Sequence, residues 1–273
     1  MIDLNNNRKN IFQNYGFREC PHYSEDGVIL KIFDNVNISK RPFVVEFGEH
    51  RVLGTTTRAF RIKYLAKSIY FSGDYNFKSF YLNIIDIFKC MFSKNISFCK
   101  FFFNLPFKYY VTPDNIINLF YKKKVKKIDL ICIDIDSYDY FVAKKILETE
   151  LSPTLFIIEY NSNLPINSEL TLKFGQKRKN NNKRIYGASF LAIYKLFKKN
   201  NYKLIHISGF CNLFFIKNEF GNNFIEPDYT SEIPQNDEEV KEYIIKYCQK
   251  SFLPSWYGEK YLSDDDLLEY SKI

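Results

Sequence analysis

Carboxylates gather at the end of an apolar run near the middle of the chain. The predominantly apolar stretch 128–135 has Asp134 near its end, and Asp136 and Asp139 follow closely. Its short, nearly continuous apolar character predicts a strand buried on both faces of a parallel sheet. Ligands bind outside the carboxyl ends of such strands, so these acids suit a cofactor, a metal or a proton acceptor. The alternative is that Asp136 or Ser137 serves only as the N-cap of the next helix, expected over 138–149.

A second apolar run also ends in polar groups. Residues 153–161 predict a further buried strand that finishes in Glu159 and Asn161. Because neighbouring parallel strands end at the same edge of a sheet, we expect Asp136, Glu159 and Asn161 to share one crevice. Carboxylate and amide oxygens suit Mg²⁺ or Mn²⁺. A hydrogen-bonded polar cluster without a metal is the alternative.

A glycine-containing turn follows the strand predicted over 42–48. Gly48 at its end, and Gly54 just before a predicted helix, allow the backbone to approach a ligand closely. The next strand, predicted over 68–74, delivers Asp74 roughly twenty residues beyond the turn, where a carboxylate can accept the ribose hydroxyls of an adenosine. Ordinary turns are the alternative for each of these features.

Composition indicates one large α/β core. The chain has 273 residues, 46% of them hydrophobic, and a formal charge of +8 that does not by itself select an acidic partner. Its 6 cysteines are scattered without a CxxC pair, which indicates reduced thiols rather than a zinc site or a disulfide framework. The N-terminus is polar, and the apolar windows are interrupted before membrane-spanning length. We therefore expect a soluble, cytoplasmic protein with no membrane span.

Three parts are predicted along the chain. Residues 1–40 form a polar lead and a first helix, 41–220 form the α/β domain, and 221–273 form an acidic extension interrupted by prolines. The strands predicted over 202–208 and 211–217 form a hairpin that closes the sheet with an antiparallel edge. The extension either packs against the basic body or serves as a contact in a homo-oligomer.

The region before the acidic strand gives weaker signals. We expect a helix near 77–88, a strand near 96–102, and a helix that begins with Thr112 as its N-cap. The lysine run 122–127 is open to two interpretations, a solvated helix end or a contact with nucleic acid. The first is preferred, so nucleic acid is not the expected partner.

A series of motifs occurs in an order that resembles a known family, the FkbM-like group of S-adenosylmethionine-dependent methyltransferases found among glycan-modifying genes. The motifs are Tyr23-Ser-Glu-Asp-Gly27, Val44-Val-Glu-Phe-Gly48, Val111-Thr-Pro-Asp-Asn115, Ile128-Asp-Leu-Ile-Cys-Ile-Asp-Ile-Asp136, Ile157-Ile-Glu-Tyr-Asn161, Tyr186-Gly-Ala-Ser189 and Asn212-Leu-Phe-Phe215. The resemblance covers the chain from Tyr23 to Lys217.

The resemblance implies a Rossmann-like methyltransferase fold, with a mostly parallel central sheet and an antiparallel C-terminal edge hairpin. It also implies S-adenosylmethionine as the cofactor and a sugar hydroxyl of a glycan or glycoconjugate as the acceptor. The residues carried over by position are Glu46 and Gly48 in the first cofactor motif, Asp74 as the ribose acid, Asp134 and Asp136 in the acidic motif, and Glu159 with Asn161 after the following strand.

The leading hypothesis is therefore an O-methyltransferase, with Asp134 and Asp136 at the reacting groups and a divalent metal held by Asp136, Glu159 and Asn161. His50 is preferred over His206 as an imidazole base because it lies beside the cofactor turn.

Two alternatives stay open. The residues Glu49-His50-Arg51 stand where the family has a small residue and Asp-Gly, and Ser137 replaces a glycine, which would suit a binding or scaffold protein that has lost methyl transfer. The lysine runs and aromatic residues would suit an RNA-directed methyltransferase.

Overall fold

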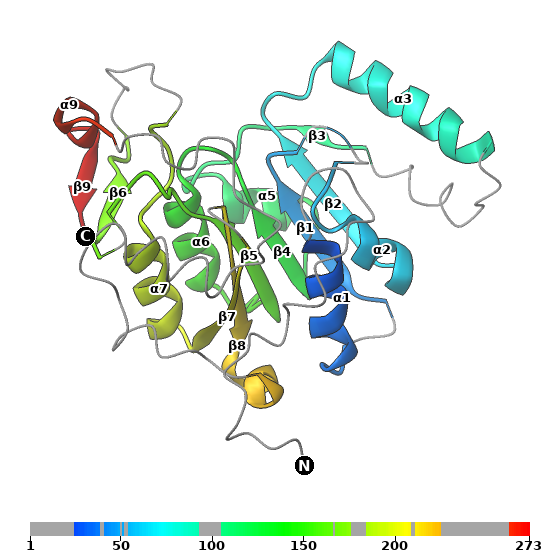
Figure 1. Ribbon diagram of the computed structural model, residues 1–273. Helices are drawn as coiled ribbons and strands as arrows, with labels where there is room; N and C mark the ends of the chain where they lie inside the picture. The colour runs from blue at the N-terminus through cyan, green and yellow to red at the C-terminus, as the bar shows by residue number, and fades with distance from the viewer. Residues whose placement is uncertain are drawn as a thin grey trace.

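The computed structural model describes residues 25–38, 41–49, 51, 54–92, 105–165, 167–175, 184–208, 211–224 and 262–273. Within this part, the chain forms a seven-stranded sheet and a separate two-stranded sheet. Helices pack on both faces of the large sheet (Figure 1).

The strands are β1 (Phe43–Phe47), β2 (Lys67–Ser72), β3 (Phe107–Lys108), β4 (Leu130–Ile133), β5 (Leu155–Glu159), β6 (Leu170–Leu172), β7 (Tyr202–Ser208), β8 (Asn212–Lys217) and β9 (Tyr270–Lys272). The helices are α1 (Glu25–Asp34), α2 (Arg58–Tyr64), α3 (Phe77–Phe92), α5 (Ile116–Lys122), α6 (Asp139–Leu147), α7 (Phe190–Lys199) and α9 (Asp264–Leu267), with a 3₁₀ helix at Asn218–Asn223.

The large sheet has the strand order β3-β2-β1-β4-β5-β8-β7. Its first five strands in this order run parallel, whereas β8 lies antiparallel to both β5 and β7. The prediction of a mostly parallel sheet with an antiparallel C-terminal hairpin is confirmed. Because β1 lies between β2 and β4, the chain reverses its direction of winding there, and such switch points are where α/β sheets bind ligands.

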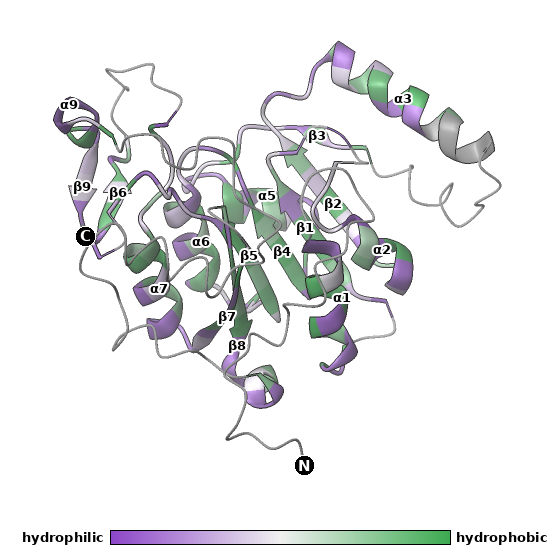
Figure 2. Cartoon of the chain, viewed as in Figure 1, coloured by the Kyte–Doolittle hydropathy of each residue, from purple (hydrophilic) through white to green (hydrophobic). Residues whose placement is uncertain are grey.

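The continuous apolar strands are explained by two hydrophobic cores. Along β1, Val44 faces a core formed with α1 and α2, whereas Val45 faces a core formed with α5, α6 and α7. In β4, Leu130 faces the core formed with α1 and α2, and Ile131 faces the core formed with α5, α6 and α7. Since both faces of the central strands are covered, nearly every side chain is apolar, as Figure 2 shows for β4 and β5.

One predicted helix start is wrong, because the residues Thr112–Asn115 form a turn that precedes the helix. The side-chain oxygen of Asn115 accepts the backbone N–H of Thr112 at 3.0 Å, and α5 begins at Ile116. Thr112 therefore closes a turn before the helix rather than capping it. The strand predicted near 96–102 lies outside the described residues, so it stays a prediction, and the edge strand β3 lies at Phe107–Lys108.

The end of the chain returns to the α/β domain. Strand β9 pairs antiparallel with β6, with Tyr270 opposite Leu172, and the two strands lie side by side in Figure 1. Of the acidic extension predicted over 221–273, the structure describes 221–224 and 262–273, and the domain limits at 40 and 220 stay predictions. Among the described helices, none combines the length and apolar character needed to cross a bilayer.

Candidate functional site

A pocket of about 500 Å³ opens across the carboxyl ends of the parallel strands. This volume lies within the usual range of small-molecule sites. Most of the predicted site residues line it together: Glu46, Gly48, Gly54, Asp74, Asp134, Asp136 and Glu159. The sheet therefore gathers groups that are up to about a hundred residues apart in sequence, as the switch-point rule predicts.

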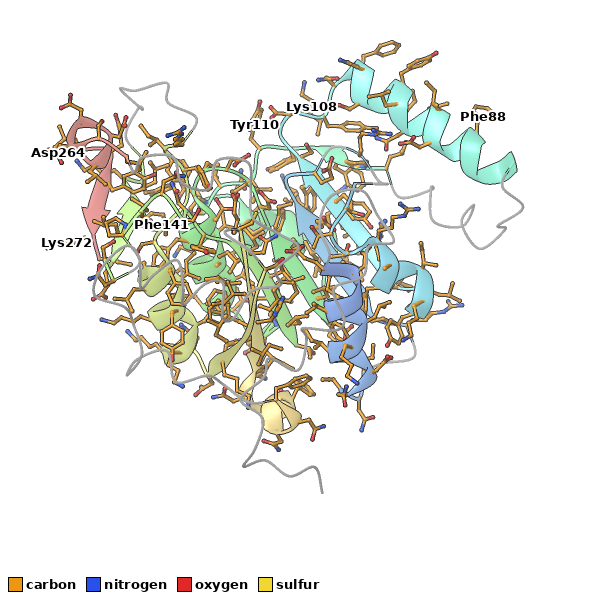
Figure 3. The ribbon with its side chains drawn as sticks, in the orientation of Figure 1. Phe88, Lys108, Tyr110, Phe141, Asp264 and Lys272 are labelled. Carbon is orange, nitrogen blue, oxygen red and sulfur yellow. The ribbon has the colours of Figure 1, made fainter. Side chains whose placement is uncertain are left out.

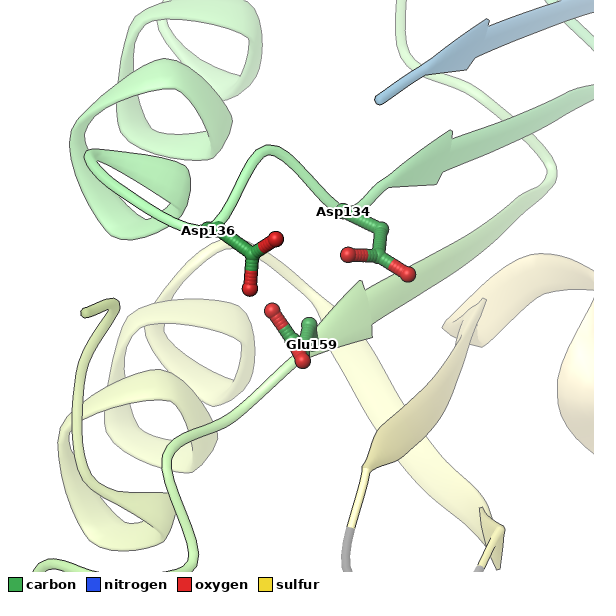
Figure 4. Close-up of side chains that lie close together, drawn as sticks. All are labelled: Asp134, Asp136 and Glu159. Atoms are coloured by element: carbon green, nitrogen blue, oxygen red, sulfur yellow. The ribbon is translucent and has the colours of Figure 1, made fainter. Parts of the chain in front are cut away.

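Three carboxylates meet at one end of this pocket. Asp134, Asp136 and Glu159 each offer an oxygen within 4.8 Å of the others (Figure 4). At that distance two full charges repel by about 3 kcal/mol at an effective dielectric constant of ~20, less where solvent screens the exposed Asp136. Burial raises the pKa of Asp134 and Glu159 well above the usual range, and the neighbouring acids raise it further. The cluster therefore favours a bound cation or a shared proton.

Glu159 gives independent evidence for a ligand. Its side chain is only 8% exposed, and its Oε1 atom accepts a long hydrogen bond of 3.7 Å from the thiol of Cys211. Its other oxygen, Oε2, is buried and receives no hydrogen bond from any described residue. Buried carboxylate oxygens are ordinarily satisfied by a donor or a metal. Oxygen-only carboxylate sites of this kind suit Mg²⁺ or Mn²⁺.

The turn that carries Asp136 is held by Asp139. Asp136 has a φ of 52°, a left-handed conformation that costs about 1 kcal/mol outside glycine. The buried carboxylate of Asp139 accepts the N–H groups of Ile135 at 2.9 Å and Ser137 at 3.0 Å. Burial raises the pKa of Asp139 to about 6, although these hydrogen bonds oppose the shift.

These contacts correct two sequence interpretations. Neither Asp136 nor Ser137 caps α6, because the helix begins at Asp139 after Tyr138, and the side chain of Tyr138 makes no capping hydrogen bond. Asp139, which had been grouped with the reactive acids, fixes the backbone instead.

Asn161 does not face the acid cluster as a ligand. Its side-chain N–H₂ group donates to the carbonyl oxygens of Arg184 at 2.8 Å and Tyr186 at 2.9 Å and to the hydroxyl of Tyr270 at 3.0 Å. Its oxygen accepts the backbone and side-chain N–H groups of Asn163, both at 2.9 Å. The described residues that could hold a metal together are therefore Asp134, Asp136 and Glu159, whereas Asn161, predicted as a ligand with Asp136 and Glu159, orients the chain after β5.

Gly48 is required for a reason internal to the protein. Its φ is 105°, and a Cβ atom built there would lie 1.5 Å from the carbonyl oxygen of Asp134. Any side chain would push the ends of β1 and β4 apart. The close approach that Gly48 allows is therefore made to the backbone of Asp134. Gly48 also lines the pocket.

Glu46 holds the loop that follows β1. Its buried carboxylate accepts the N–H of Thr56 at 2.8 Å, and the N–H and hydroxyl of Thr57 at 3.2 and 2.5 Å. Burial raises the pKa of Glu46, and these hydrogen bonds oppose the rise. Glu46 therefore shapes the pocket wall near Gly54, and a direct contact with a cofactor stays a prediction.

Asp74 lies exposed at the opposite end of the pocket. The hydroxyl of Tyr110 donates to its Oδ1 at 3.4 Å, and the ring of Tyr110 covers Gly73, where a Cβ atom would lie 2.5 Å from the ring. The rest of the Asp74 carboxylate is accessible to a ligand. Sequence reasoning missed Tyr110 and Cys211 as pocket residues, because neither belongs to a local motif.

The two histidines considered as candidate bases differ in what the structure shows. His50 lies outside the described residues. His206, in β7, is buried against Phe214 with a ring separation of 5.2 Å, and burial lowers its pKa to about 3. It is therefore a neutral core residue and does not line the pocket, as expected for a histidine in an apolar strand.

Comparison with known proteins gives no assignment, since no protein-family model and no curated protein matches the chain.

Proposed function

We propose that this protein is an S-adenosylmethionine-dependent O-methyltransferase that methylates a sugar hydroxyl of a glycan or glycoconjugate, assisted by Mg²⁺ or Mn²⁺. The observation that carries the proposal is one pocket with two chemically different ends. Asp74 stands at one end and the carboxylates of Asp134, Asp136 and Glu159 stand at the other, across the switch point of a parallel sheet.

The Asp74 end suits the nucleoside part of the cofactor. An exposed carboxylate at the tip of β2 can accept the ribose hydroxyls, and the ring of Tyr110 beside it offers an apolar surface. Gly48 and Gly54 also line the pocket, so their backbone can contact the cofactor.

The acid end suits the acceptor. The carboxylates of Asp134, Asp136 and Glu159 would hold the metal, since Oε2 of Glu159 otherwise lacks a partner among the described residues. A divalent cation held there would supply Lewis acidity toward the acceptor hydroxyl and neutralise the mutual repulsion of the acids.

The proposed reaction is a direct transfer between the two ends. The bond from the sulfonium sulfur to the methyl group breaks as the acceptor oxygen forms its bond to the same carbon. The hydroxyl proton passes to a side-chain base, for which His50 is the first candidate, since Asp134 is assigned to the metal. The protein's contribution is chiefly orientation, because the pocket holds both reactants in one alignment.

Isothermal titration calorimetry tests the proposal. S-adenosylmethionine and S-adenosylhomocysteine should each bind the full-length protein at one site, and binding of Mg²⁺ or Mn²⁺ should be measurable separately. Transfer of labelled methyl groups to glycan acceptors should follow. Absence of cofactor binding, with and without metal, in a protein shown to be folded would refute the proposal.

The same titrations address the scaffold alternative. The residues at the altered turn make internal contacts, because Oε1 of Glu49 accepts the N–H of Arg51 at 2.8 Å and Arg51 forms an ion pair with Asp86 at 2.6 Å. Cofactor binding without transfer to any acceptor would favour a protein that kept the site and lost the reaction.

A further inference from the structure

Helix α3 presents its apolar side outward. Its polar residues Ser79, Asn83 and Asp86, spaced to share one face, are buried, with exposed fractions of 4%, 0% and 3%. Two of its aromatic residues, Phe77 and Phe88, are instead 83% and 54% exposed. Amphipathic helices of water-soluble domains normally have the opposite orientation.

An ion pair connects the polar side of α3 to the rest of the domain. Asp86 pairs with Arg51 at 2.6 Å, whereas the hydrogen bond from the side chain of Asn83 to the carbonyl oxygen of Ser79, at 3.0 Å, lies within α3. Rotating the helix to bury its aromatic residues would expose the helix side of this ion pair. The ion pair therefore favours the orientation in which the aromatic side points outward.

Positive charge accompanies the aromatic residues. We define the aromatic–lysine face as Phe77, Phe80, Tyr81 and Phe88 with Lys78 and Lys108. Figure 3 labels Lys108 close to the start of α3 and Phe88 farther along the helix. Asp86 is the one acidic residue in the sequence of α3, and it is buried and paired. The face is therefore apolar and cationic together.

The face borders the pocket described above. Phe77 follows Asp74 by three residues in the chain, and Asp74 accepts the hydroxyl of Tyr110, which is 67% exposed. A surface that docks on this face would therefore lie beside the Asp74 end of the pocket mouth.

We propose that the aromatic–lysine face docks the protein on an anionic lipid surface. Exposed aromatic rings on one side of a helix enter the boundary between headgroups and acyl chains, and lysines beside them pair with anionic headgroups. This inference rests on α3 and its surroundings, so it does not depend on methyl transfer.

Two other partners fit this face less well. In a symmetric dimer the same lysines would meet across the two-fold axis and repel one another. Single-stranded RNA is bound by aromatic platforms within a positively charged groove that follows the phosphates, whereas α3 is a projecting helix (Figure 1) whose described exposed face carries one lysine, Lys78.

Vesicle flotation with the full-length protein tests the proposal. The protein should float with vesicles of phosphatidylcholine mixed with phosphatidylglycerol, and raising the salt concentration should weaken binding. Vesicles of phosphatidylcholine alone should bind at least tenfold less, because each lysine near an anionic surface adds to the affinity.

Two double variants should separate the contributions of the face. Phe77→Ser with Phe88→Ser removes the apolar contact, and Lys78→Glu with Lys108→Glu reverses the charge. Each pair should weaken binding to anionic vesicles at least tenfold. Leu268→Ser and Lys272→Glu are matched controls, since both residues are exposed on the C-terminal segment, where Figure 3 labels Lys272 far from Phe88. Circular dichroism checks that all variants fold.

Three results would overturn the proposal. The first is a failure in flotation: either the wild-type protein does not float with anionic vesicles at low salt, or the double variants of the aromatic–lysine face float as well as the controls. The second is a dimer in sedimentation that Phe77→Ser with Phe88→Ser dissociates, which would assign the face to a second copy. The third is single-stranded RNA binding that Lys78→Glu with Lys108→Glu abolishes while vesicle binding persists.

Discussion

The two ends of the pocket differ in how firmly the protein holds their side chains. At the acid end, Glu159 is buried, the turn carrying Asp136 is held by two hydrogen bonds to Asp139, and the chain after β5 is fixed by Asn161. At the other end, Asp74 is exposed, and the structure shows one long hydrogen bond to it, from Tyr110 at 3.4 Å.

The difference matches the work proposed for each end. Groups that stabilise charge during a reaction act best when their positions are fixed before substrate arrives, because no reorganisation is then needed. A cofactor that must enter and leave in every cycle needs accessible contacts. The left-handed conformation of Asp136 fits this view, since backbone strain persists where surrounding structure enforces it.

Removing charge at the acid end should give the largest effect. Asp136→Asn and Glu159→Gln keep the side-chain shape but remove a metal-binding charge, so each should lower turnover at least ~100-fold. Affinity for S-adenosylmethionine, measured by calorimetry, should stay within about threefold, because the Asp74 end is untouched. Asp114→Asn, at an exposed acid before α5, is the matched control and should behave as wild type.

A chelator provides the opposing check on the acid end. Full activity in EDTA, with an unchanged pH profile, would remove the metal from the proposal. It would leave a side-chain base for the hydroxyl proton, and His50→Ala would then be the first variant to measure.

Removing the acid at the other end should have a smaller and different effect. Asp74→Ala loses hydrogen bonds from the ribose hydroxyls to a charged acceptor, each worth about 1.5–3 kcal/mol. Cofactor affinity should fall at least ~10-fold, whereas metal affinity should not change. Asp114→Ala is the control. If Asp74→Ala binds the cofactor as tightly as wild type, the two ends do not divide the work as proposed.

The central sheet was predictable because its signals are local. Strands β1, β4 and β5 are apolar runs buried on both faces, and the hairpin of β7 and β8 consists of strands adjacent in the chain. The acids at the ends of β4 and β5 were predictable for the same reason, since parallel strands that pair bring their carboxyl ends together.

The exact starts of the helices were not predictable from sequence. Asp136, Ser137 and Thr112 all have side chains suited to an N-cap, yet each lies in a turn before its helix, where the side chains of Asp139 and Asn115 accept the N–H groups of the turn. Which polar residue takes a given N–H group depends on distances of a few tenths of an ångström, and a one-dimensional pattern does not contain them.

Asn161 was misassigned because its partners are far away in sequence. Its residue type and its place after β5 suit a metal ligand, but Tyr270 lies 109 residues further along and satisfies it. Strands β6 and β9, which bring Tyr270 there, have three residues each. That is too short for an alternating apolar pattern to be recognised in the sequence.

The variant Tyr270→Phe should have the smallest effect. It tests whether contacts from the C-terminal strand help to fix the acid end of the pocket. The hydroxyl of Tyr270 accepts the N–H of Tyr186 and the side-chain N–H of Asn161, and it donates to the carbonyl oxygen of Tyr186, at 2.9, 3.0 and 2.9 Å. Tyr270→Phe keeps the ring and removes all three hydrogen bonds. The backbone N–H of Tyr186 then loses the hydroxyl as its acceptor, so the free energy of unfolding should fall by about 1–3 kcal/mol in urea titrations.

Metal binding decides whether this network positions the acid cluster. Asn161 lies two residues after Glu159 and keeps its bonds to Arg184 and Tyr186 in Tyr270→Phe. Metal affinity should therefore fall only about two- to fivefold, because the end of β5 becomes less well fixed but no metal ligand is removed. Tyr121→Phe, at a tyrosine that is 83% exposed, controls for the loss of a hydroxyl and should change neither quantity. If Tyr270→Phe loses stability but binds Mn²⁺ as tightly as Tyr121→Phe, the C-terminal strand stabilises the fold without preorganising the site.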